Sequence, residues 1–135
     1  MAINLLINQN LPQINGTNLM TTMYGIPNCD TIKKARKWLS EHNIDYDFHD
    51  YKKQGVPTDV IKIAIEALGL DTVVNKRGTT YRKLDDTIKS SLNEDNALAL
   101  LNDHASMIKR PILKTSNGIL IGFKAEQYEA HFGLK

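Results

Sequence analysis

The chain has 135 residues, of which 41% are hydrophobic and 24% are charged, as is typical of one ordinary globular domain. Its formal net charge of +2 is spread along the chain, so we expect no nucleic-acid partner. No apolar stretch approaches the roughly 20 residues of a membrane span, so we expect no membrane partner either. The single cysteine excludes an internal disulfide and the disulfide-rich secreted class, which favours a cytoplasmic location.

Residues 1–20 are rich in Asn, Gln and Thr, and Pro12 and Gly16 interrupt any regular period. We therefore expect a loosely ordered N-terminal extension that carries no chemistry. The apolar run at Ile3–Ile7 lacks the basic residues before it and the small-residue cleavage site after it that a signal peptide needs.

The first half of the predicted domain, which spans residues 21–135, has the pattern of a βαβ unit. Thr21–Tyr24 is predicted to form a strand, Gly25–Asn28 a loop, and a helix is predicted to begin at Cys29 and to reach about His42. Asp45–Tyr51 alternates like a second strand, which a helical crossover makes parallel to the first. The apolar stripe of the helix consists of Ile32, Ala35, Trp38 and Leu39.

The middle of the chain is predicted to be a helical insert at about residues 57–105. Pro57 opens one helix and Gly69 closes it, and a second helical region covers about Asp85–Leu101. Between them, Val74–Leu84 contains turn formers and no sustained period, so we expect an ordered loop.

The last segment predicts a hairpin and a helix. Asn117-Gly118 lies between the apolar segments Ile112-Leu113 and Ile119–Ile121, and Ala125–Phe132 supplies the final helix. The order β-α-β, helical insert, β-β-α predicts an α/β fold of the thioredoxin-like class with an inserted helical subdomain.

Cys29 is the candidate nucleophile because the free N–H groups and dipole of a helix start stabilise a thiolate, and Lys33 adds positive charge. Asn28 is a candidate N-cap, and the hydroxyl of Thr31 lies in the first turn, so this loop offers donors to an anion. Position alone leaves a small, unreactive buried cysteine as an equally good interpretation.

Two arginines are further candidates for anion binding. Arg77, beside Gly78, offers a planar donor fork, although a solvated surface charge is the simpler interpretation. Arg110 precedes Pro111 at the entry to a strand, where a cis peptide is one possibility and an ordinary strand-start proline the other. The four histidines have no metal-ligand spacing, so no metal site is predicted.

Four segments together resemble the ArsC/Spx family, and its YffB-like branch in particular. The resemblance covers the chain from about Thr21 to the C-terminus, with the motifs in the same order and at compatible intervals. The segments are Tyr24-Gly25-Ile26-Pro27-Asn28-Cys29-Asp30-Thr31, Asn75-Lys76-Arg77-Gly78, Lys109-Arg110-Pro111-Ile112-Leu113 and Gly122-Phe123-Lys124.

The resemblance implies a thioredoxin-like sheet, a catalytic cysteine at Cys29 and a cis-proline at Pro111 that faces it. In arsenate reductases of the family, arginines that match Arg77 and Arg110 bind the oxyanion. Lys124 lies near the expected place of a third arginine, so one anion-binding element is altered. Spx-type regulators carry a Cys-x-x-Cys switch that this chain lacks, because Ile32 occupies its second position.

We therefore predict a glutathione-dependent thiol–disulfide oxidoreductase with Cys29 as nucleophile, glutathione as co-substrate and a small-molecule or protein disulfide as substrate. No second cysteine is present to resolve a mixed disulfide, so the resolving thiol must come from outside the chain. Arg77 and Arg110 are expected to pair with the carboxylates of glutathione. We also expect the protein to be a monomer. The alternatives are a glutathione-coupled arsenate reductase and a non-enzymatic, Spx-like regulator that binds a protein partner.

Overall fold

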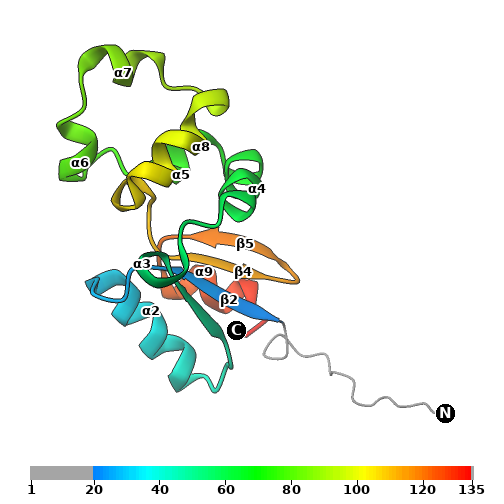
Figure 1. The fold of residues 1–135 in the computed structure, drawn as a ribbon. Helices are drawn as coiled ribbons and strands as arrows, with labels where there is room; N and C mark the ends of the chain where they lie inside the picture. The colour runs from blue at the N-terminus through cyan, green and yellow to red at the C-terminus, as the bar shows by residue number, and fades with distance from the viewer. Residues whose placement is uncertain (1–19, 135) are drawn as a thin grey trace.

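The computed structural model describes residues 20–134, and the expected extension therefore lies outside the described residues except for Met20. A four-stranded sheet forms the centre of the molecule (Figure 1). Its strands are β2 (Thr21–Gly25), β3 (Asp47–Asp50), β4 (Ile112–Thr115) and β5 (Gly118–Ile121). Among the described residues, the helices outside the insert are α2 (Asp30–Glu41), α3 (Tyr51–Gln54) and α9 (Ala125–His131).

The sheet has the strand order β3-β2-β4-β5, with β2 and β3 parallel and the other two pairs antiparallel. The predicted βαβ unit is confirmed, because α2 connects the parallel strands. β2 lies in the middle and pairs Tyr24 with His49 on one side and with Ile112 on the other. The carboxyl end of β2 and the start of β4 therefore meet at one edge of the sheet.

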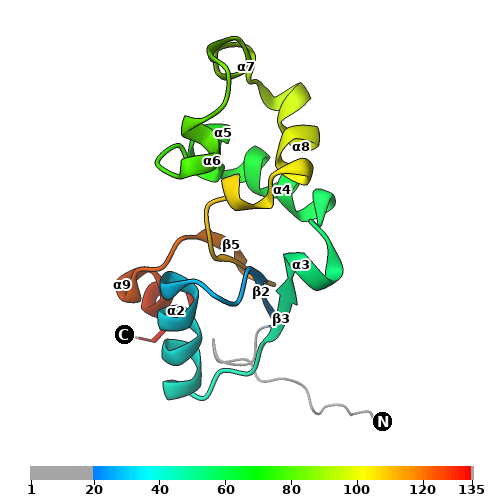
Figure 2. The same ribbon diagram turned by 60° about the vertical axis from the view of Figure 1, so that its left-hand side comes forward.

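Alternate residues of the strands point into two hydrophobic cores, one on each face of the sheet. Met23, Leu113 and Leu120 face α2 and α9, where Trp38 and Tyr128 meet edge to face. The opposite face packs against the helical insert, which both views place on that side of the sheet (Figures 1 and 2). Its strand residues are Tyr24, Ile112, Ile119 and Ile121.

The helical insert runs from Thr58 to Met107 and is more broken than its sequence pattern predicts. It comprises α4 (Thr58–Leu68), α5 (Leu70–Val73), α6 (Thr79–Arg82), α7 (Asp86–Ser91), α8 (Glu94–Asp103) and the 3-10 turn η2 (Ala105–Met107). The predicted helical region over about Asp85–Leu101 is confirmed as helical, but it is divided into α7 and α8, because α7 ends at Ser91 and the capping box of Asn93 starts a new helix. The predicted loop also contains the short helix α6.

The predicted hairpin is confirmed, but its turn lies one residue earlier than expected. Thr115 pairs with Gly118, so Ser116 and Asn117 form the loop. The Oγ of Thr115 accepts the Asn117 N–H at 3.0 Å and lies 2.6 Å from Nε2 of His131. These bonds, and one from the Asn117 amide to the His131 carbonyl at 3.1 Å, tie the hairpin to the end of α9.

Within residues 20–134, no helix is both long enough and apolar enough to cross a membrane.

Candidate functional site

Cys29 lies at the junction between the loop after β2 and helix α2. Its backbone is extended, with φ −148° and ψ 128°, and its carbonyl accepts the first helical bond from Lys33 at 2.9 Å. Cys29 is therefore the N-cap, and the expectation that Asn28 caps the helix was wrong. The reason is a tight turn in which the Cys29 N–H donates to the Pro27 carbonyl at 3.0 Å and delays the helix by one residue.

The absence of a side chain at Gly25 lets α2 come close to the end of β2. A Cβ at Gly25 would collide with Cδ1 of Ile32 and lie 3.9 Å from the Cβ of Arg110. Ile32 is fully buried, so it has little room to move. Gly25 thus brings the first turn of α2 and the segment before β4 together around the thiol.

The environment of Cys29 lowers its pKa below the ordinary value of a cysteine. Partial burial by itself raises this pKa, but hydrogen bonds from the N–H of Ile32 and from Arg110, the positive charge of Arg110 and the Thr31 N–H outweigh it. The neutral thiol makes no capping hydrogen bond within the described chain, so these donors act mainly on the thiolate, which is the stronger acceptor.

Arg110 reaches the thiol from a short segment that is fixed on both sides. The Lys109 N–H donates to the Val73 carbonyl at 2.8 Å, and the Pro111 carbonyl accepts the Gly122 N–H at 2.8 Å. The Arg110–Pro111 peptide is cis and Pro111 is buried, in agreement with the cis-proline that the family resemblance implies. The backbone that carries Arg110 is thereby anchored to both the insert and the strand hairpin.

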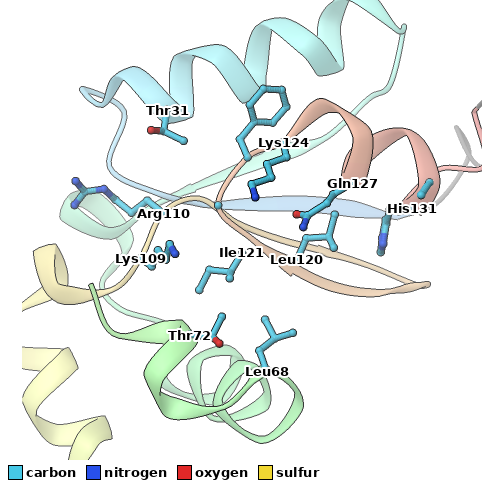
Figure 3. A pocket seen from close by; sticks show the side chains of 13 residues that line it. Thr31, Leu68, Thr72, Lys109, Arg110, Leu120, Ile121, Lys124, Gln127 and His131 are labelled. Atoms are coloured by element: carbon cyan, nitrogen blue, oxygen red, sulfur yellow. The ribbon is translucent and has the colours of Figure 1, made fainter. Parts of the chain in front are cut away.

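A groove of about 780 Å³ extends from Thr31, near the thiol, along β5 and α9 (Figure 3). It contains three cations, Lys109, Arg110 and Lys124, and its floor is apolar. In Figure 3 the Lys124 side chain points toward the middle of the groove. The remaining lining residues are Leu68, Thr72, Leu120, Ile121, Gly122, Phe123, Gln127, Ala130 and His131.

The groove brings together three of the site residues predicted from the sequence and leaves others out. Thr31, Arg110 and Lys124 line it, and Arg110 connects it to Cys29. Asn28 and Lys33 are exposed and are not among the described groove residues.

Arg77 lies apart from this groove. It is exposed and lines a separate cavity of about 300 Å³ with Asp71, Asn75 and Lys76. Lys109 lines both cavities. It gives the groove the second cation that was expected to be Arg77. Lys109 was not predicted as a site residue, and no local pattern in the sequence marks it as one.

The sequence profile of the ArsC family matches residues 24–131. The chain belongs to the ArsC family. A curated relative from Haemophilus influenzae, described only as an uncharacterized protein, is 46% identical over 113 residues, which cover 84% of this chain and 99% of that protein. The global transcriptional regulator Spx of Staphylococcus haemolyticus is 28% identical over 110 residues, or 80% of this chain and 83% of Spx.

Solved structures of this ArsC family share the fold. The YffB protein superposes with a TM-score of 0.80 at 45% identity, over 84% of this chain and 99% of YffB. An arsenate reductase-related protein from Brucella melitensis has a TM-score of 0.66 at 43% identity, over 85% of this chain and 96% of the other. These matches confirm the expected α/β thioredoxin-like fold with its inserted helices.

A buried tyrosine of this ArsC-family protein, Tyr51, interacts electrostatically with Arg110. Tyr51, at the start of α3, is 4% exposed, and its hydroxyl has no hydrogen-bond partner among the described residues. Burial raises the pKa of Tyr51, and the charge of Arg110 opposes that rise, so the two side chains interact. The strand predicted over Asp45–Tyr51 ends at Asp50, so Tyr51 begins α3 instead, and no pattern in the sequence indicates its contact with Arg110.

No cluster of three or more His, Cys, Asp or Glu side chains in the described part of this ArsC-family protein could hold a metal ion.

Proposed function

We propose that this ArsC-family protein is a glutathione-dependent thiol–disulfide oxidoreductase with Cys29 as its nucleophile. The observation that carries the proposal is the pairing of a stabilised Cys29 thiolate with Arg110 at one end of a cationic groove. The thiolate attacks one sulfur of a disulfide, a mixed disulfide forms on Cys29, and the other sulfur leaves as a thiol.

Glutathione completes the cycle because this chain has one cysteine in its entire sequence. A glutathione thiolate attacks the mixed disulfide, releases an oxidised product and regenerates the Cys29 thiolate, so both electrons come from thiols. The carboxylates of glutathione match the charge of Lys109, Arg110 and Lys124, and charge-assisted hydrogen bonds of this kind contribute about 1.5–3 kcal/mol each. The proposed site therefore replaces Arg77 by Lys109.

The decisive experiment measures glutathione-dependent reduction of the mixed disulfide between glutathione and 2-mercaptoethanol, coupled to glutathione reductase. Wild-type protein should accelerate the reaction, Cys29→Ser should abolish that acceleration, and Arg110→Ala should reduce kcat/KM by about tenfold or more. Lys34→Ala, an exposed cation on α2 outside the groove, should keep wild-type activity. A wild-type rate no higher than the uncatalysed rate would overturn the proposal.

Reduction of arsenate is the second candidate, because Arg110 beside Cys29 provides donors for an oxyanion. A solved structure described as a possible arsenate reductase from Streptococcus mutans is 34% identical to this chain, with a TM-score of 0.65 over 79% of this chain and 93% of that protein. Release of arsenite from arsenate and glutathione, lost in Cys29→Ser, would support this activity. Absence of arsenite in an assay where the disulfide is reduced would leave the thiol reductase alone.

A non-enzymatic regulator is the third candidate and is favoured by the similarity to Spx. In that case the chain would bind a protein partner, and Cys29 would be incidental or sensory. A pull-down whose partners are unchanged by Cys29→Ser, together with an ordinary cysteine titration, would favour the regulator. A Cys29-dependent reductase activity would count against it. We place the protein in the cytoplasm as a monomer under each of these proposals.

A further inference from the structure

The groove beside Cys29 has two chemically different parts. The part near Thr31 carries Lys109, Arg110 and Lys124, and no Asp or Glu occurs among the described residues that line the groove. Beyond these cations most of the lining residues are apolar, and the polar side chains among them are Thr72, Gln127 and His131. That part includes Leu68, Leu120, Ile121 and Phe123.

The carboxylates of glutathione account for the cationic part alone. With a volume of about 780 Å³, the groove falls within the range of roughly 300–1,000 Å³ that holds small-molecule ligands. Its apolar part has no counterpart in glutathione, which is a polar tripeptide. A ligand that complements the complete groove is anionic at the end near Thr31 and apolar along β5.

Leu68 gives the clearest indication that the apolar part is not simply a portion of the core. It lies in the last turn of α4 and is half-buried. It belongs to neither of the two hydrophobic cores that the described residues form. In Figure 3 it lies across the groove from Leu120 of β5, with Thr72 beside it. Leu120 belongs to the sheet face that packs on α2 and α9, but β5 is an edge strand, so Leu120 lines the groove at the sheet edge together with Leu68 of the insert.

We propose that the preferred substrate is a mixed disulfide between glutathione and an apolar thiol, with the apolar group lying between Leu68 and Leu120. This inference rests on the proposed glutathione-dependent activity. The Cys29 thiolate attacks the glutathione sulfur, the S–S bond breaks, and the apolar thiolate leaves and takes a proton from water. A second glutathione then attacks Cys29–glutathione, glutathione disulfide departs and the Cys29 thiolate returns. The net reaction converts one mixed disulfide and one glutathione into the apolar thiol and glutathione disulfide.

The test compares two glutathione mixed disulfides that differ only in their second half, one with hexanethiol and one with 2-mercaptoethanol. Wild-type protein should reduce the hexyl compound with a kcat/KM about tenfold higher, because apolar surface is removed from water in the groove. Leu68→Gln should bring that ratio close to one. Ile63→Gln, on the same helix but 44% exposed and outside the groove, should keep the wild-type ratio.

Thr72→Val provides an independent variant, since it replaces a hydroxyl with a methyl group in the same wall and should increase the ratio above that of the wild type. It keeps the inference testable if Leu68→Gln does not fold. Equal kcat/KM values for the two compounds in wild-type protein would overturn this inference and leave the proposed function intact. Failure to reduce either compound would overturn the proposed function itself. A high ratio that neither variant changes would show that the apolar group does not lie in this groove.

Discussion

Arg110 lies beside Cys29, and its hydrogen bond and positive charge act on the sulfur although the two residues are 81 positions apart in the sequence. The contact depends on the central position of β2, which places the loop after β2 next to the segment that enters β4. This relationship makes the reactivity of the thiol dependent on a residue from the far end of the domain.

Replacing Arg110 by Ala should move the pH profile of Cys29 alkylation to higher pH. Burial, which raises the pKa of Cys29, would remain, whereas the hydrogen bond and charge of Arg110 that lower it would be lost. Rates of alkylation by iodoacetamide, measured on the intact protein between about pH 5 and 10, would test this shift, because that range covers the titration of a cysteine.

Arg77→Ala is the matched control for that experiment, because Arg77 is exposed and lines the separate cavity. Its alkylation profile should coincide with that of the wild type. An equal displacement in both variants would mean that general loss of positive charge, rather than the contact with Arg110, controls the thiol.

A second prediction concerns the close approach at Gly25. Gly25→Ala should destabilise the protein by about 1–3 kcal/mol, because the new Cβ would collide with Ile32 in a packed core. The double variant Gly25→Ala/Ile32→Val removes the colliding methyl group and should be less destabilised than the sum of the two single variants. Urea unfolding of all four proteins completes this double-mutant cycle. Strict additivity would show that the collision is not the cause.

The sequence allowed the βαβ unit, the helix that follows Cys29 and the hairpin to be predicted, because each depends on local pattern. Alternation identified β3, the Asn117-Gly118 pair between apolar segments identified the hairpin, and the spacing of apolar residues identified the buried stripe of α2. The contact between Arg110 and Cys29 could be expected only from the family resemblance, since spacing along the chain does not determine which loops meet.

The role of Lys109 and the separation of Arg77 from the groove could not be predicted in this way. Both follow from how the insert returns to the sheet, where the Lys109 N–H bonds to the Val73 carbonyl and Val74 forms an isolated bridge with Ile108. These are tertiary contacts between irregular segments, and no periodicity marks them. The break at Asn93 was missed for a different reason, because its capping box interrupts an otherwise helical composition.

Buried tyrosines carry a third prediction. The hydroxyls of Tyr51 and Tyr128 are buried without a hydrogen-bond partner among residues 20–134, and a buried polar group without a partner lowers stability. Tyr51→Phe and Tyr128→Phe should therefore leave stability unchanged or increase it by up to about 1 kcal/mol, since the ring packing is kept. Thermal and urea unfolding measure the effect. Marked destabilisation by either substitution would reveal a partner for that hydroxyl, such as a bound water.

The last prediction concerns the response of stability to pH through His131. Burial lowers the pKa of His131 below its ordinary value of 6.5, so the unfolded chain binds a proton at a higher pH than the folded chain does. The stabilising contribution is therefore complete above about pH 6.5 and is lost as the pH falls through the pKa of the folded state. Thr115, whose Oγ lies 2.6 Å from Nε2 of His131, orients the ring between β4 and α9.

His131→Gln should flatten this part of the stability profile, because glutamine retains a polar group and cannot titrate. The free energy of unfolding from urea titrations at several pH values between about 5 and 8 measures the slope for both proteins. His104→Gln, which replaces an exposed histidine at the end of α8, is the matched control and should keep the wild-type slope. An unchanged slope in His131→Gln would assign the loss of stability at low pH to other groups.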